Sequence, residues 1–113
     1  GKGLGDDGLV STTIDLAQFV PALASRQLSG ANAEFTQQTV DMGSGLSYGP
    51  GVMKRETTWG TLWGYEGNTK GFSGSMWYLP ENKTTIVALA NGEEYGPALT
   101  ALVDNILALL AAP

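Results

Sequence analysis

The side chains best suited to chemistry lie together in one ten-residue segment, Trp63 to Phe72, which reads WGYEGNTKGF. The segment carries a phenol, a carboxylate and an ammonium group among three glycines. Glycines on strands let a ligand or a second backbone approach closely. This makes the segment a candidate ligand site, and the simpler interpretation of the same residues is a glycine-rich hairpin turn.

The residue types that the sequence lacks exclude several kinds of active site. There is no cysteine and no histidine. A thiol nucleophile, a Ser-His-Asp triad, a disulfide and an ordinary zinc site are therefore excluded. General-base or metal chemistry would fall to Asp, Glu, Lys or Tyr, and we expect no cofactor.

The charge pattern bears on possible partners. Eleven acidic and six basic residues give a net charge of -5, and the charges do not form runs. A nucleic-acid surface needs clustered Lys and Arg, so we expect no nucleic-acid partner. The longest nearly apolar stretch, Ala98 to Pro113, contains Asp104 and Asn105 and is too short for a membrane span.

Two helices are predicted in the N-terminal third, after a flexible lead-in at residues 1–8. The first runs from Ser11 to about Leu28, because apolar residues recur at helical spacing after a capping-box-like start at Thr12. Pro21 should kink or restart this helix, at a cost of about 3 kcal/mol. A second, shorter helix is predicted from Ala31 to about Val40.

Four strands and a final helix are predicted after residue 43. The predicted strands are Leu46–Lys54, Thr57–Tyr65, Phe72–Leu79 and Thr84–Ala90. The last strand is a continuous aliphatic run and is expected at the centre of the sheet. Pro97 suits the start of a helix, and six residues form an apolar stripe along it: Leu99, Leu102, Val103, Ile106, Leu107 and Leu110. The prediction is one α+β domain, residues 1–113, with helices packed on an antiparallel sheet of about four strands.

Four stretches, in order, resemble the C-terminal part of the serine β-lactamase and penicillin-binding family, in its class C β-lactamase and D-alanyl-D-alanine carboxypeptidase branch. Gly8–Phe19 resembles the helix that follows the catalytic domain. Tyr48–Val52 resembles the family's Tyr-Gly-x-Gly strand. Gly64–Phe72 resembles the strand of the third active-site motif, and Tyr78–Glu81 with Val87–Asn91 resembles the last strand pair.

The resemblance implies an acyl-enzyme mechanism, in which a serine from a Ser-x-x-Lys motif attacks the substrate. None of the seven serines has a lysine three residues later, and neither Tyr-x-Asn nor Ser-x-Asn occurs. We therefore expect this chain to be the C-terminal part of a serine hydrolase, inactive alone, whose partner is the N-terminal catalytic portion of the same protein.

Residues Tyr65 to Thr69 are the site residues that the resemblance implies. Tyr65 stands where the family has His or Lys, and the backbone N–H of Asn68 is implied as half of an oxyanion hole. Glu66, Gly67 and Thr69 are implied as substrate-binding. A phenol can only donate a hydrogen bond at neutral pH, which favours an esterase-like or altered specificity over penicillin-type recognition. Lys70 could restore positive charge, or could be a solvated turn residue.

The expected function is thus that of a D-Ala-D-Ala carboxypeptidase-like or esterase-like hydrolase of a peptidoglycan-like or small-molecule substrate. The alternative is a non-catalytic binding or interaction module that uses Gly67 to Phe72 as a ligand-facing edge. Resemblance also implies a location outside the cytoplasm. An unpaired sheet edge in the isolated chain would favour a homo-oligomer.

Overall fold

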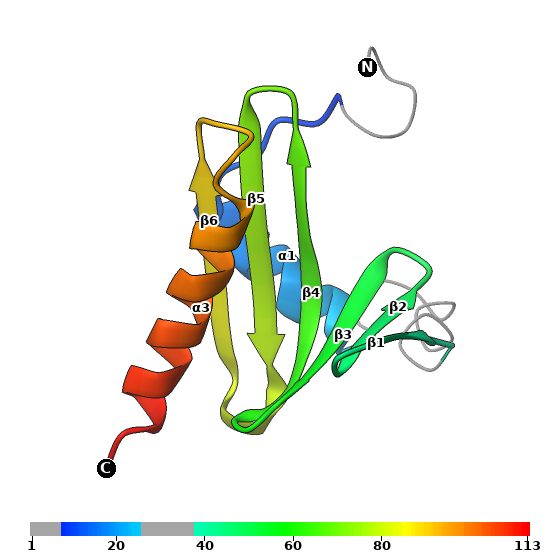
Figure 1. Cartoon of the computed structure of the whole chain (residues 1–113), viewed down its shortest axis with the longest axis vertical. Coiled ribbons are helices and arrows are strands. Elements are labelled where there is room, and N and C mark those ends of the chain that lie inside the picture. Colours follow the sequence, from blue (N-terminus) through cyan, green and yellow to red (C-terminus); the bar gives the residue numbers. More distant parts are fainter. Residues whose placement is uncertain (1–7, 26–37) are drawn as a thin grey trace.

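Six antiparallel strands form one sheet whose spatial order follows the chain order (Figure 1). The structure, a computed structural model, describes residues 8–25 and 38–113. The strands are β1 (Val40–Gly43), β2 (Leu46–Gly49), β3 (Val52–Thr57), β4 (Gly60–Thr69), β5 (Phe72–Leu79) and β6 (Thr84–Ala90). Two helices, α1 (Thr13–Ala24) and α3 (Gly96–Ala111), and a short 3-10 turn, η1 (Pro80–Asn82), complete the described elements.

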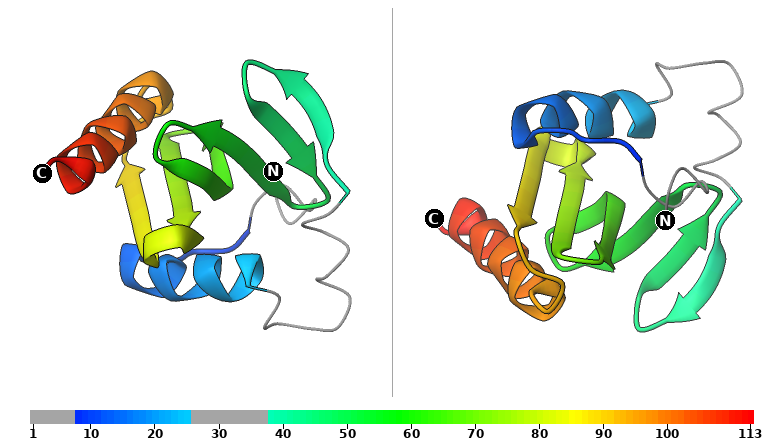
Figure 2. Two further views of the ribbon diagram at one scale, coloured as in Figure 1. Left: turned by 90° about the horizontal axis from the view of Figure 1, so that it is seen from below. Right: turned by 90° about the horizontal axis from the view of Figure 1, so that it is seen from above.

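The two helices lie on opposite faces of the sheet. Figure 2 shows β4, β5 and β6 between them, with β1 and β2 beyond both helices. Both helices contact β4, β5 and β6. The α+β class and the antiparallel sheet covered by helices are therefore confirmed, with six strands in place of about four.

Local capping explains where α1 begins. The Asp15 backbone N–H donates to Thr12 Oγ1 at 3.2 Å, which satisfies one of the free donors of the first turn. Pro21 lies inside one continuous helix, so the helix does not restart there. The predicted residues 26–28 of this helix, and residues 31–37 of the predicted second helix, lie outside the described residues. Val40, its predicted last residue, instead begins β1.

The two additional strands are β1, which was not predicted as a strand, and the second half of a predicted strand that a tight turn divides. The predicted strand Leu46–Lys54 is two strands, β2 and β3, which are antiparallel and separated by Pro50 and Gly51. Gly51 has a φ of +78°, a conformation that glycine adopts without strain. The strand predicted as Thr57–Tyr65 likewise lies at 60–69, because Thr57 pairs with Gly60 across a second turn.

The position predicted for Thr84–Ala90 is wrong. This segment forms β6, which lies at the end of the strand order and has β5 as its one strand neighbour among the described residues. Its aliphatic character follows from the helices on both faces, and Ile86 is buried there. A continuous apolar run shows that both faces of a strand are covered, and it carries no information about the strand's hydrogen-bonding edges.

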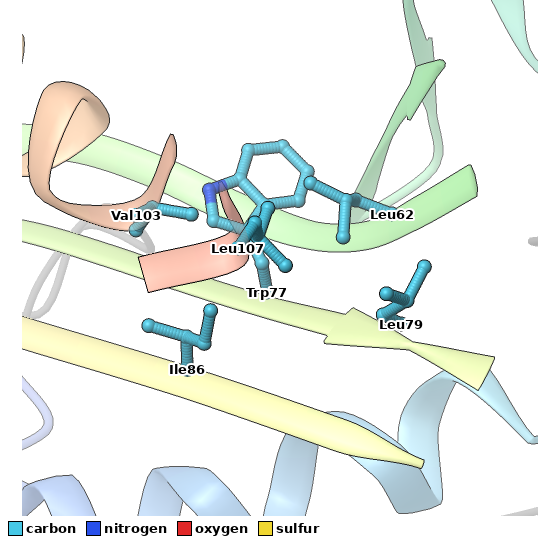
Figure 3. Close-up of a cluster of buried hydrophobic side chains, with 6 residues drawn as sticks. All are labelled: Leu62, Trp77, Leu79, Ile86, Val103 and Leu107. Atoms are coloured by element: carbon cyan, nitrogen blue, oxygen red, sulfur yellow. The ribbon is translucent and has the colours of Figure 1, made fainter. Parts of the chain in front are cut away.

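The hydrophobic core lies between α3 and the sheet. Figure 3 shows its six buried side chains: Leu62, Trp77, Leu79, Ile86, Val103 and Leu107. Trp77 is 1% exposed, and its indole N–H donates to Ser75 Oγ at 3.0 Å. Two members of the predicted stripe on α3 remain open to solvent, since Leu102 is 44% and Leu110 is 57% exposed. Neither described helix has the length and apolar character needed to cross a membrane.

Candidate active site

The β4–β5 hairpin carries all five residues predicted for the site, at consecutive positions 65–69 of β4. The register pairs Thr69 with Phe72. Lys70 and Gly71 form the two-residue turn between the strands. The five residues therefore lie at the end of the sheet where β4 turns into β5.

Strand alternation divides the five residues between two faces. Successive side chains on a strand point to opposite faces of the sheet. A side chain of α1 lines the concavity that contains Tyr65, and a side chain of α3 donates a hydrogen bond to Glu66. Tyr65, Gly67 and Thr69 thus share the α1 face, while Glu66 and Asn68 share the α3 face. The period-two alternation of the strand was the signal that could have separated them from sequence.

A concavity of about 330 Å³ opens on the α1 face. Its apolar side chains are those of Leu16, Phe72, Met76 and Leu89. Tyr65 lines it as well and is 38% exposed. Gly67 pairs with Gly74 across the two strands, so the sheet has no side chains at this point. A Cβ at Gly67 would lie 3.2 Å from the Tyr65 ring, so glycine leaves room for that ring.

Tyr48 is a neighbour of the predicted site that sequence analysis did not assign to it. It lies on β2, and its ring meets that of Tyr65 edge to face, with centroids 6.0 Å apart and an interplanar angle of 80°. The hydrogen-bonding interaction with the Tyr65 phenol, followed by partial burial, raises the pKa of Tyr48. Only tertiary contact between β2 and β4 reveals this pair, because 17 residues of sequence separate the two tyrosines.

A second concavity, of about 390 Å³, lies between β4 and the first turns of α3. Glu66, Asn68 and Thr100 are its polar side chains, and Met53 and Pro97 are its larger apolar ones. Thr100 Oγ1 lies 3.2 Å from Glu66 Oε2 and 3.1 Å from the Gly96 carbonyl oxygen, so one hydroxyl faces two acceptors. Sequence analysis gave no signal for Thr100, which the fold brings in from 34 residues away.

The edge of β4 beside these concavities is open. Strand β3 pairs with β4 from Gly60 to Gly64. Residues 65–69 of β4 have β5 as their one strand neighbour within the described ranges. Backbone groups that point away from β5 in this segment can therefore meet a ligand or another segment of chain.

A family model described as Beta-lactamase matches residues 2–111. The chain belongs to the beta-lactamase family. Among solved structures it is similar to a D-stereospecific amidohydrolase from Streptomyces sp., with 25% sequence identity and a TM-score of 0.62. That match covers 74% of this beta-lactamase-family chain and 26% of the amidohydrolase chain, so this chain spans about a quarter of its length. A search of curated proteins finds no match.

None of the described cations of this beta-lactamase-family chain lines either concavity. Lys54 pairs with Glu56 at 2.7 Å, and Arg55 pairs with Asp104 at 2.8 Å. Lys70 is exposed in the hairpin turn, and neither it nor Lys83 lines either concavity. Glu66 is thus the one charged side chain in their walls. Within residues 8–25 and 38–113, no three acidic side chains are grouped to hold a metal ion.

Proposed function

We propose that this chain supplies the substrate-binding wall of a serine hydrolase that works through an acyl-enzyme. The observation that carries the proposal is the open edge of β4 at residues 65–69, in a chain whose family match extends over 2–111. Hydrolysis of an amide or ester needs a hydrogen-bond donor at the place where the substrate's carbonyl oxygen gains negative charge. An unpaired strand edge offers backbone N–H groups for that purpose.

The register identifies which N–H is available. Thr69 pairs with Phe72 across a two-residue turn, and the closing pair of such a turn exchanges its backbone hydrogen bonds. Hydrogen-bonding directions alternate along a strand, so we expect the Asn68 N–H to point away from β5, toward the open edge. In the proposed reaction a serine oxygen attacks the substrate carbonyl carbon, and the Asn68 N–H donates to the resulting oxyanion. Collapse of this tetrahedral intermediate expels the amine or alcohol and leaves the acyl group on the serine. Water then hydrolyses the acyl-serine ester and releases the acid.

Tyr65 has the second role in the proposal. Its phenol is 38% exposed and lines the concavity on the α1 face, while its ring is held by Tyr48. A phenol is protonated at neutral pH and can donate one hydrogen bond to a substrate oxygen. Thr69 and Gly67 lie on the same face, so a substrate bound beside Tyr65 would cross the flat Gly67–Gly74 pair.

The nucleophile comes, in this proposal, from an N-terminal catalytic portion of the same protein. The outer edge of β6 has no strand partner among the described residues, and Leu102 and Leu110 of α3 are exposed. Additional strands and a helix from that portion would pair with the edge and cover the leucines. The similar amidohydrolase is about four times as long as the segment matched here, which leaves room for such a portion.

The test compares this chain alone with the chain joined to its serine-bearing portion. We expect no burst of product from a p-nitrophenyl ester and no covalent adduct by intact mass for the chain alone. The joined protein should form the acyl adduct, and Tyr65→Phe should lower its kcat/KM about tenfold, as expected for a lost hydrogen bond to substrate. Tyr78→Phe, which removes a hydroxyl from β5 outside both concavities, is the matched control. An acyl adduct on the chain alone would contradict the proposal.

A further inference from the structure

We propose that Glu66 determines substrate specificity by binding an amino group of the substrate in the concavity between β4 and α3. This inference rests on the proposed function and adds the chemical class of the substrate. The ligand it predicts carries a cationic amine near the scissile carbonyl. A ligand with a carboxylate in that place should be excluded.

The geometry of Glu66 is that of a binding group held in position. The side chain is half-buried, and the Thr100 hydroxyl, from the second turn of α3, lies 3.2 Å from its Oε2 and shares its one proton between that oxygen and the Gly96 carbonyl. Its other oxygen, Oε1, has no hydrogen-bond partner among the described residues. One oxygen is thus anchored and one is available to a ligand. Anchoring reduces the entropy lost when a charged side chain binds.

Charge distinguishes between ligand classes at this concavity. Glu66 is its one charged side chain, and Asn68 and Thr100 add neutral polar groups. None of the described cations lines this concavity, and Lys54 and Arg55 are already paired to acidic residues. A carboxylate attracts an ammonium group through a charge-assisted hydrogen bond and repels another carboxylate. The concavity therefore favours an amine.

The concavity is close to the place where the substrate carbonyl is expected. Asn68, whose backbone N–H is the proposed oxyanion donor, also lines it. Glu66 lies two residues earlier on the same face, about 6.6 Å along the strand. The glutamate side chain spans part of this separation, so an amine one or two bonds from the carbonyl comes within its reach. Gly67 lines both concavities, which places the two walls at a single stretch of β4.

The binding test uses the isotope-labelled 113-residue chain and three small probes. D-Alaninamide has a free amine, N-acetyl-D-alaninamide is neutral, and 2-methylmalonamic acid has a carboxylate in place of the amine. We expect D-alaninamide to shift the backbone amide signals of Glu66, Asn68 and Thr100. Glu66→Gln should weaken this binding about tenfold or more, because the charge-assisted bond is lost. Glu93→Gln removes the same charge from an exposed residue outside the concavity and should have no effect.

The outcomes separate the inference from the proposed function. Equal affinity for the three probes, no binding of D-alaninamide, or unchanged affinity in Glu66→Gln would each overturn the inference. Thr100→Val tests the anchor: it should weaken D-alaninamide binding while the α3 signals stay in place. Charge-selective binding without any turnover by the joined protein would support the inference and contradict the acyl-enzyme proposal. Turnover by the joined protein without preference for a free amine would support the acyl-enzyme proposal and contradict the inference about Glu66.

Discussion

The rings of Tyr48 and Tyr65 meet edge to face, with centroids 6.0 Å apart and planes at 80°. This contact joins β2 to β4 three residues before Asn68, the proposed oxyanion donor. Aromatic pairs of this geometry stabilise a fold by about 0.5–1.5 kcal/mol beyond the area they bury. The pair therefore links the orientation of Tyr65 to the β1–β3 part of the sheet.

A titration of the tyrosines should show this contact directly. Because the interaction with Tyr65 raises the pKa of Tyr48, the native state holds the Tyr48 proton more tightly than the unfolded state does. The resulting stabilisation is complete below about pH 10, the ordinary value for tyrosine, and is lost as the pH rises through the native value. Phenolate absorbance of the folded chain should show Tyr48 ionising late. Tyr65→Phe should lower its pKa toward the ordinary value, and Tyr95→Phe should not.

The ion pair between Arg55 on β3 and Asp104 on α3 should contribute measurably to the stability of the fold. Arg55 Nη2 lies 2.8 Å from Oδ1 and 2.9 Å from Oδ2, and the two side chains are 22% and 34% exposed. Arg55 Nη1 is buried without a hydrogen-bond partner in the described part of the chain. Asp104→Ala should lower the free energy of unfolding by about 1–3 kcal/mol, because it leaves the whole guanidinium unpaired.

Urea unfolding of Asp104→Ala is the measurement, with Glu56→Ala as control. Glu56 forms an ion pair of similar length with Lys54, but the pair is more open to water. We expect a smaller loss from the control, since solvent screens such pairs. Equal losses would mean that the Arg55–Asp104 pair contributes no more than a surface pair.

Close approach of β5 to β4 makes Gly64 intolerant of substitution. A Cβ at Gly64 would overlap the backbone carbonyl of Met76. Neither strand can move apart without breaking the backbone hydrogen bonds between β4 and β5. Gly64→Ala should therefore lower the free energy of unfolding by more than about 3 kcal/mol. Gly67→Ala is the matched change on the same strand, where the Cβ meets only the movable Tyr65 ring. Thermal unfolding of the two variants should differ strongly, and similar melting temperatures would contradict this packing.

The isolated chain should self-associate. The outer edge of β6 lacks a strand partner in the described residues, and exposed leucines of α3 lie on the helix that packs on the same strand. An open edge beside apolar surface favours pairing with another copy. Light scattering over a concentration series should show mass rising with concentration. Leu102→Lys with Leu110→Lys should reduce that rise more than Asn105→Lys does.

Hydrogen exchange gives the second readout for association. Amides of β6 that face outward should exchange fast at low concentration and become protected as oligomers form. A stable monomer at high concentration, with the amides of β6 and α3 strongly protected from exchange, would show that the chain buries its hydrophobic core without a partner. The proposed docking of an N-terminal portion would then lose its support.

The sequence by itself determined the local elements and the family. The Thr12 cap, the strand Phe72–Leu79 and the helix that begins near Pro97 follow from hydrogen bonding and periodicity within a few residues. The four ordered motifs led to the family that the match over 2–111 shows. Such features depend on neighbours in the chain, so they can be inferred before the fold is known.

Tertiary structure decided how these elements meet. It placed β6 at the end of the strand order among the described residues. The sequence could not show this, because the aliphatic residues of β6 reflect the helices on both faces and not its strand neighbours. It also brought Thr100 to Glu66 and Tyr48 to Tyr65, across 34 and 17 residues. These contacts depend on strand order and helix placement, which arise from packing of the whole core. No local pattern around Thr100 or Tyr48 carries that information.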